Sequence, residues 1–350
     1  MNLEIRDLLY TVFSLQNSKI PLNLVGKKEI CTETLHLMKH KYFARKFILL
    51  ILSLFIVATV TFFLMQAAPG DPFMQEQAIP EEIMKSMYAH YGLDQPWYIQ
   101  YVKYLKGLIT WDLGPSFKYE GRTVNNIINE GFPVSFILGL EAIFISLFTG
   151  IILGTIAAVK RSKWQDNMAM IFAVIGISVP NFIMATFLQY LFAIKMDLLP
   201  VARWGSFEHS ILPALSLAAL PTAFIARLTR ANMVEVLEQD YVQTAKSKGL
   251  STCQVVCRHV LKNSLLPVLT YLGPLASAVL TGSFIVEKIF GIPGLGGWFV
   301  NSITNRDYTV IMGVTVFYST ILMLSVLMID VLYTLIDPRI RLGSNKGVGK

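Results

Sequence analysis

Residues 47–65 have the sequence FILLILSLFIVATVTFFLM, a run of 19 residues without a charge. A helix needs roughly 20 mostly apolar residues to cross the roughly 30 Å hydrocarbon core of a bilayer, and a helix satisfies its own backbone hydrogen bonds there. Residues 47–65 therefore predict a transmembrane helix. Five more apolar segments of suitable length follow, at residues 133–159, 167–194, 210–226, 264–286 and 308–336. We expect an all-α membrane protein with six transmembrane helices.

Small and helix-breaking residues lie inside these segments. The stretch 167–194 is uncharged for 28 residues and contains Gly176 and Pro180, so we expect it to be tilted, or broken near these two residues. In the preceding segment, Gly150 and Gly154 are four residues apart, a spacing typical of closely packed membrane helices.

The composition supports the same class. Of 350 residues, 54% are hydrophobic and only 15% are charged, whereas soluble domains carry about 25% charged residues. This balance argues against an ordinary soluble enzyme, a nucleic-acid-binding module and a disordered chain, and it favours membrane lipid as the surroundings. The three cysteines are Cys31, Cys253 and Cys257. Their odd number, with no CxxC pair, predicts neither a disulfide framework nor a zinc site.

The charges between the segments predict the orientation. Six crossings leave both termini on one side, and that side holds 21 of the 30 Lys and Arg residues. The positive-inside rule places it in the cytoplasm. The short loop 160–166, with Lys160, Arg161 and Lys163, is the strongest indication, because short loops follow the rule best. We therefore expect cytoplasmic N and C termini.

The N-terminal residues are a separate question. Residues 1–37 precede a basic collar at 38–46, immediately before the first apolar segment. We expect 1–37 to be an N-terminal cytoplasmic extension of a permease domain at 38–341, with 342–350 a cytoplasmic tail. The functional protein could begin at Met38. The alternative is that 1–37 contains a short helix lying on the membrane.

Two polar connections are long enough to be functional. The first, residues 67–132, is expected on the outer side. It begins with the helix-breaking stretch 68–72 (APGDP), and helices are expected from Pro80 to Tyr88 and over 97–109. This segment predicts a cap over an outer vestibule. The alternative is an interfacial decoration held by its aromatic residues.

The second connection, residues 227–263, is expected on the cytoplasmic side. Residues 232–248 have helical composition, and Gly249 is suited to end that helix because glycine adopts left-handed geometry at little cost. Ser251 and Gln254 then fit a capping box, and a second helix is expected to run toward Pro267. The result is a helix–glycine–helix bend that projects from the membrane.

Several kinds of chemistry have no sequence support. The chain has no GxxxxGK[ST] phosphate loop, no HExxH and no GxSxG. The five histidines lack zinc-ligand spacing, and His259 lies off the helical face of Cys257. We therefore expect no catalytic residue, no cofactor and no metal. Glu141 and Asp330 are the only acids inside the apolar segments. They keep open a proton relay in a self-sufficient secondary carrier, although Asp330 can simply reach the interface.

Five ordered motifs carry a family resemblance over about residues 38–341. They are 240–251 (DYVQTAKSKGLS) continued by 258–267 (RHVLKNSLLP); 68–72; 91–96 (YGLDQP) leading to Asp112-Leu-Gly114; 287–296 (EKIFGIPGLG) with Arg306-Asp-Tyr308; and 337–341 (DPRIR). Together they resemble the permeases of binding-protein-dependent ABC importers, in the oligopeptide/dipeptide/nickel branch, and its B-type subunits most of all. One departure is Gln243-Thr244-Ala245 where the general pattern has Glu-Ala-Ala, so no role of that Glu is transferred.

The resemblance implies a type I ABC importer permease fold in the plasma (inner) membrane of a bacterium. It implies a non-catalytic subunit that moves di- or oligopeptides into the cytoplasm by alternating access. Its implied partners are a second, homologous permease subunit in a heterodimer, two cytoplasmic ABC ATPase subunits and an extracytoplasmic substrate-binding protein. The loop 227–263 would be the coupling loop that docks on an ATPase. The docking positions implied are Asp240, Thr244, Ala245, Lys248, Gly249, Ser251 and Arg258. The resemblance assigns no substrate-binding residue.

Overall fold

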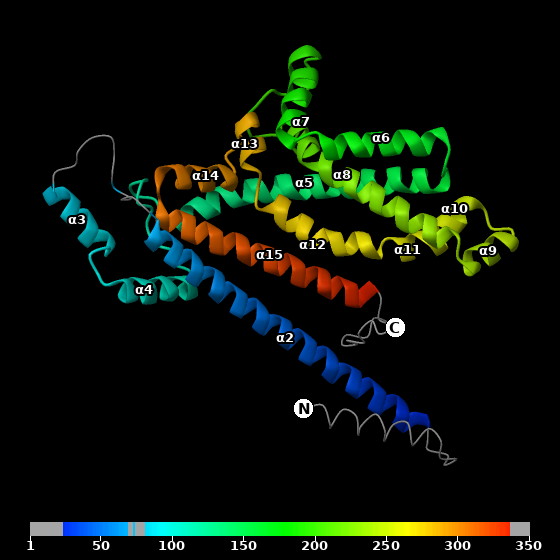
Figure 1. Ribbon diagram of the computed structural model, residues 1–350, viewed down its shortest axis with the longest axis horizontal. Helices are drawn as coiled ribbons and strands as arrows, with labels where there is room; N and C mark the ends of the chain where they lie inside the picture. Colours follow the sequence, from blue (N-terminus) through cyan, green and yellow to red (C-terminus); the bar gives the residue numbers. More distant parts are fainter. Residues whose placement is uncertain (1–23, 69–72, 74–80, 337–350) are drawn as a thin grey trace. The chain divides into compact units, whose positions relative to one another are not determined.

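The computed structural model describes residues 24–68, 73 and 81–336. The chain divides into two units, residues 1–51 with 339–350, and residues 52–338. The helices of the described residues are labelled in Figure 1 and are α2 (Leu24–Ala67), α3 (Glu81–Tyr91), α4 (Trp97–Thr110), α5 (Val124–Val159), α6 (Trp164–Ser178), α7 (Asn181–Leu188), η1 (Gln189–Lys195), α8 (Phe207–Leu237), α9 (Asp240–Ser247), α10 (Thr252–Val255), η2 (Val256–Val260), α11 (Leu261–Ser264), α12 (Leu266–Leu280), α13 (Phe284–Phe290), α14 (Leu295–Asn305) and α15 (Tyr308–Ile336). The elements η1 and η2 are π-helical.

Apolar length supports up to six crossings in the described part of the chain. Four helices are long and apolar enough to span a membrane alone: α2 from Ala44, α5, α8 and α15. Two further candidates are bent pairs. One joins α6 to α7 and η1 with a bend of 108°, and the other joins the helical stretch Thr252–Ser264 to α12 with a bend of 53°. The expected all-helical membrane architecture is confirmed.

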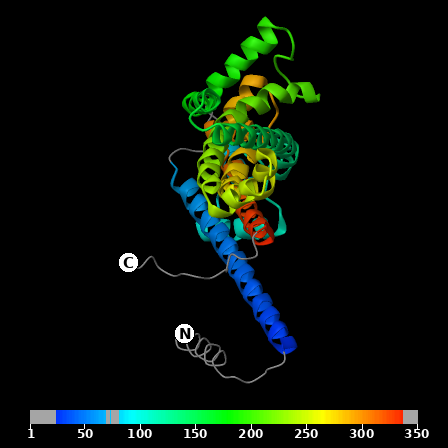
Figure 2. The same ribbon diagram turned by 90° about the vertical axis from the view of Figure 1, so that its right-hand side faces the viewer.

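The centre of the second unit is formed by α5, α8 and α12. Helix α8 lies beside the C-terminal part of α5 (Figure 1), and α12 packs beside both. Figure 2 shows the same green and yellow helices grouped together from another side. A Cβ atom at Gly150 would lie 2.8 Å from Cβ of Ile225, and one at Gly154 would lie 2.5 Å from the carbonyl oxygen of Ala226. The expectation of close packing at these two glycines is confirmed, because only glycine leaves room for α8.

The segment 167–194 takes the broken alternative. Helix α6 ends at Ser178, and Pro180 stands at the N-terminal cap of α7 with extended backbone angles (φ −57°, ψ 143°). Proline disfavours helical geometry at the residue before it, and Val179 is accordingly extended. The chain therefore turns sharply here instead of continuing as one tilted helix.

Three sequence expectations about helix boundaries are wrong. A single span over 264–286 does not form, because α12 ends at Leu280 and Gly282 adopts φ +87°. The segment expected to start at Pro133 starts at Val124, with the proline accommodated inside α5. The helix expected over 232–248 is two helices, because Gln239 is extended and separates α8 from α9.

The 67–132 segment contains the two expected helices, α3 and α4. Helix α4 packs on the last turns of α2. The Tyr101 hydroxyl and the Thr59 hydroxyl are 2.7 Å apart, and the Phe62 ring stacks on Tyr104 with centroids 5.7 Å apart. The expected breaker stretch 68–72 lies mostly outside the described residues. The expectations for residues 1–23 and for the tail 337–350 also lie outside them.

Candidate functional site

The most distinctive local structure is a bend formed by residues 238–264, between α8 and α12; it is called the bend below. Helix α8 ends at Leu237, and the Gln239 carbonyl oxygen accepts hydrogen bonds from the backbone N–H groups of Val242 and Gln243 at 3.0 and 3.2 Å. The Gln243 side-chain amide donates back to the carbonyl oxygen of Leu237 at 3.1 Å. The break between the two helices is thus held by hydrogen bonds.

Gly249 ends α9 as expected. Its φ is +81°, and its N–H donates to the Lys246 carbonyl oxygen at 2.9 Å. No atom lies within 4 Å of the place where a Cβ would stand. The requirement for glycine at this position therefore comes from the backbone angle and not from crowding.

The capping box after Gly249 is also confirmed. The Gln254 N–H donates to the Ser251 hydroxyl oxygen at 3.4 Å, and the Ser251 N–H donates to the side-chain oxygen of Gln254 at 3.0 Å. The two arms of the bend are joined further along by Tyr241 and Asn263: the Asn263 amide donates to the Tyr241 hydroxyl at 2.8 Å. Sequence reasoning did not identify that link, because the two residues are 22 positions apart.

A small hydrophobic core lies beneath the bend. Val242 and Ala245 of α9 are buried together with Val255, Val256 and Val260 of the second arm. Two residues of the membrane helices complete the cluster, Ala158 at the end of α5 and Met233 on α8. Because buried side chains in contact transmit displacement rather than absorb it, the bend is set firmly on the ends of α5 and α8.

Six of the seven residues expected at the docking surface are exposed. They are Asp240, Thr244, Lys248, Gly249, Ser251 and Arg258. The seventh, Ala245, is 5% exposed and belongs to the buried core of the bend. Its position makes it a packing residue: a larger side chain would displace the neighbouring valines. The Thr244 hydroxyl donates to the Asp240 carbonyl oxygen at 2.9 Å, which stabilises α9 locally.

The exposed face of the bend is positively charged. The bend contains two acids, Glu238 and Asp240, against four Lys and Arg residues. These are Lys246, Lys248, Arg258 and Lys262, and all four are exposed. No salt bridge joins any of them to another side chain within the described residues. The surface therefore suits an acidic partner.

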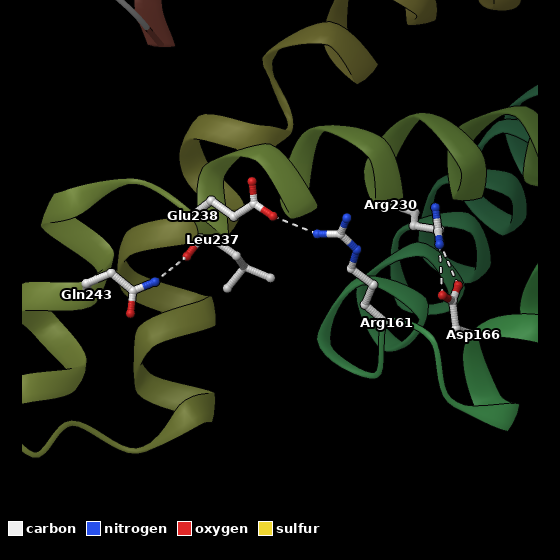
Figure 3. A network of polar contacts seen from close by, with 6 residues as sticks. All are labelled: Arg161, Asp166, Arg230, Leu237, Glu238 and Gln243. Atoms are coloured by element: carbon white, nitrogen blue, oxygen red, sulfur yellow. Dashed lines mark hydrogen bonds and ion pairs between the residues drawn. The ribbon is translucent and has the colours of Figure 1, made fainter.

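Two ion pairs connect the α5–α6 loop and the first turn of α6 to α8 and to the first residue of the bend (Figure 3). The Arg230 guanidinium donates to both carboxylate oxygens of Asp166, at 2.6 and 2.8 Å. Arg161 donates to Glu238 at 2.6 Å. Sequence reasoning used the cations of this loop only to orient the chain. The partners, Arg230 for Asp166 and Glu238 for Arg161, lie 64 and 77 residues away, so only the fold brings them together.

A second polar region lies near the other end of α5. Glu287 is 1% exposed; its carboxylate accepts hydrogen bonds from the Ser135 hydroxyl at 2.7 Å and from the Gly297 N–H at 3.2 Å. Ser135 in turn accepts from the Leu295 N–H at 2.9 Å. Burial raises the pKa of the Glu287 carboxyl above its usual range, and the hydrogen bonds from Ser135 and the neighbouring glycine N–H groups oppose that shift. A Cβ at Gly294 would lie 2.4 Å from the carboxyl carbon, so this glycine leaves room for the acid.

Asp307, just before α15, is a second fully buried carboxylate that accepts several hydrogen bonds. Its carboxylate accepts from the Ser116 hydroxyl, from the Phe117 N–H at 3.1 Å and from the Thr309 hydroxyl at 3.0 Å. The Val310 N–H donates to it at 3.4 Å. Glu287, Asp307 and their partners are called the buried-acid region below. Both acids lie in motifs that carried the family resemblance, yet neither was identified as a structural acid.

The described residues include the side chains considered for a metal site or a proton relay. They contain no group of three or more His, Cys, Asp or Glu side chains that could hold a metal ion. Cys253 and Cys257 are exposed free thiols. Within α5, the Oε2 atom of Glu141 is enclosed and has no hydrogen-bond partner among the described residues, while Asp330 is half-buried.

Two family patterns and many relatives match the sequence. The family described as "Binding-protein-dependent transport system inner membrane component" matches residues 150–342, and its N-terminal companion matches residues 38–139. The chain is 50% identical over 302 residues to the dipeptide transport system permease protein DppB of Bacillus subtilis (strain 168), covering 86% of this chain and 98% of that protein.

Two oligopeptide permeases are nearly as similar. The chain is 43% identical over 291 residues to the oligopeptide transport system permease protein OppB of Haemophilus influenzae, covering 83% of this chain and 95% of that protein. It is 42% identical over 303 residues to OppB of Salmonella typhimurium, covering 86% and 99%. The first family pattern extends over the bend and over both Glu287 and Asp307. The chain therefore belongs to the family of inner-membrane components of binding-protein-dependent transport systems.

Proposed function

We propose that this protein is the membrane permease subunit of an ATP-driven importer of di- and oligopeptides, and that the bend is the surface on which a separate ABC ATPase docks. The observation that carries the proposal is the bend itself. It is capped, packed on its own core and positively charged, yet it belongs to a chain without a nucleotide-binding motif. A rigid exposed element of this kind is suited to receive force from a partner.

The contacts of the bend support a mechanical role. Val242 and Ala245 face inward and pack against Ala158 and Met233, so a push on α9 is passed to the ends of α5 and α8. ATP-driven closure of two ATPase subunits would bias the spans toward one of two states. Asp240, Thr244, Lys248, Gly249, Ser251 and Arg258 form or shape the docking surface, and Ala245 anchors it from below.

Orientation and the remaining partners belong to the same proposal. The excess of Lys and Arg on the side of the bend supports a cytoplasmic location for it and for both termini. A second, homologous permease subunit completes the pathway. An extracytoplasmic binding protein delivers the substrate to the opposite side, where α3 and α4 lie. The peptide substrate is proposed from the names of the dipeptide and oligopeptide relatives.

The test is co-expression with the candidate ATPases, second permease and binding protein, followed by affinity purification and reconstitution in liposomes. We expect the ATPase and the second permease to co-purify, and labelled di- or oligopeptide uptake to require ATP. Accumulation of solute by this chain alone, without nucleotide, would contradict the proposal and favour the ion-coupled carrier. In that event Glu141, with its unpartnered Oε2 atom, would be the first residue to replace.

A further inference from the structure

Two ion pairs join residues 160–166, which comprise the α5–α6 loop and the first residues of α6, to α8 and the residue after it. Asp166 binds Arg230 within α8, and Arg161 binds Glu238 immediately after α8 (Figure 3). The two α8-side residues are eight positions apart, which corresponds to about 12 Å along a helix. One short turn is therefore held both to the end of α8 and to the first residue of the bend.

The two ion pairs differ in strength. The Arg161 and Glu238 side chains are 55% and 68% exposed, and exposed ion pairs contribute little. The Asp166 side chain is only 3% exposed, and both its oxygens bind the planar guanidinium of Arg230. A bidentate pair fixes relative orientation as well as distance. Asp166 also accepts a hydrogen bond from the Ser162 N–H at 2.9 Å, so the same carboxylate shapes the turn, where Ser162 is left-handed (φ +63°).

Helix α6 is positioned to transmit a displacement of its first turn to α7. It runs from Trp164, with Asp166 in its first turn, to the 108° break at Pro180, where α7 follows. A mostly apolar cavity of about 270 Å³ lies between α6, α5 and α8, lined in part by Phe172, Gly176 and Thr222. Packed interiors resist displacement, and this opening leaves α6 space to change its angle to α5.

We propose that Asp166 and Arg230 are positioning residues that make α6 move as one piece with the end of α8, so that displacement of the bend reaches the broken α6–α7 pair. The inference rests on the proposed function, because it assumes that the bend is pushed by an ATPase. Residues 160–166 would then have two roles. Their cations help to orient the chain in the membrane, and Asp166 helps to transmit the displacement of the bend to α6.

The test uses the complete importer in liposomes and compares Arg230→Gln and Arg230→Lys with wild type. The matched control is Arg122→Gln, which removes the Arg122–Glu130 ion pair, equally short at 2.7 Å but at the other end of α5. Peptide uptake, ATP hydrolysis and co-purification of the ATPase are measured for each. We expect Arg230→Gln to lower the peptide transported per ATP hydrolysed at least tenfold with assembly unchanged. Arg230→Lys should give an intermediate loss, because it keeps the charge but not the two-oxygen contact.

A distance measurement separates coupling from stability. Spin labels at Asn167 on α6 and Glu235 on α8, both exposed, are introduced with the native cysteines replaced by serine. The label distance should be the same with and without ATP in wild type, and should broaden or become nucleotide-dependent in Arg230→Gln. Parallel loss of uptake and hydrolysis, or an unchanged label distance in Arg230→Gln, would overturn the inference. Failure of the wild-type chain to bind any ATPase would instead refute the proposed function.

Discussion

The bend and the buried-acid region lie at opposite ends of α5. Ala158 contributes to the core beneath the bend, and Ser135 binds Glu287; the two positions are roughly 35 Å apart along the helix. In the bend, most hydrogen bonds join residues within about six positions of each other, and its charges are exposed. In the buried-acid region, the key hydrogen bonds join residues 152 to 191 positions apart, and both acids are enclosed.

The difference shows that a sequence motif can serve either the binding of a partner or the folding of the chain. The charged side chains of the bend are exposed and can be solvated by water or paired with a partner, so their replacement should change binding more than folding. Within the described residues, Glu287 and Asp307 accept hydrogen bonds from several N–H and O–H groups in enclosed surroundings, so their replacement should change folding first. The exposure of a motif, and not its resemblance to a family pattern, indicates which kind of defect to expect.

The largest effect is expected in the buried-acid region. Asp307→Ala removes the acceptor of the Ser116 hydroxyl and of the Phe117 and Val310 N–H groups. Each buried group left without a partner costs about 1–3 kcal/mol, so the three together should cost at least about 3 kcal/mol. The melting temperature of the purified protein in detergent should fall sharply. Glu130→Gln, at an exposed ion pair, is the control and should melt like wild type. Equal melting temperatures for the two variants would show that the hydrogen bonds of Asp307 do not stabilise the start of α15.

A smaller effect on stability, with a larger effect on coupling, is expected at Gly249. Gly249→Val places a β-branched residue at φ +81°, at a cost of about 1–2 kcal/mol. We expect peptide uptake and binding-protein-stimulated ATP hydrolysis to be lost while the melting temperature changes little. Gly249→Asn is the matched variant, because asparagine tolerates left-handed geometry, and it should retain most activity. Unchanged uptake in Gly249→Val would remove the docking role of the bend.

Charge on the bend should act through binding alone. Lys248→Glu combined with Arg258→Glu reverses two exposed cations, and each exposed ion pair is worth about 0.2–1 kcal/mol. The affinity for the ATPase should fall several-fold, and its salt dependence should weaken because fewer opposite charges meet. Lys106→Glu on α4, equally exposed, is the control and should bind the ATPase as wild type does. Identical affinities for both changes would argue against an electrostatic contribution.

The smallest effect concerns pH. Burial raises the pKa of Glu287 in the folded protein, and hydrogen bonds to the charged form offset part of that shift. The contribution of this group to stability is fully present below its unfolded value of about 4.3, and it is lost as pH rises through the folded pKa. The melting temperature of wild type should therefore decrease relative to Glu287→Gln as pH rises above the unfolded pKa of about 4.3. If the melting temperature of wild type instead rises relative to Glu287→Gln as pH increases, the raised pKa of Glu287 would be contradicted.

Sequence reasoning predicted most of the bend because its determinants are local. Gly249 needs only its own backbone angle, and the Ser251–Gln254 box needs only three residues of helix, so both are visible in a short stretch. It erred at Gln239, where the extended backbone is stabilised by Gln243 reaching back to Leu237. It also placed Ala245 among the docking residues, although the side chain packs inward.

The sequence alone determined the membrane class, the approximate number of crossings and the bend, because apolar length, glycine geometry and helix capping are properties of neighbouring residues. Only the tertiary structure decided that α12 stops at Leu280, that Glu287 and Asp307 are enclosed, and that Asp166 binds Arg230. The last two outcomes depend on partners 64 to 191 residues away. The pairing of distant polar groups follows from how the helices pack, and no short stretch of sequence contains that information.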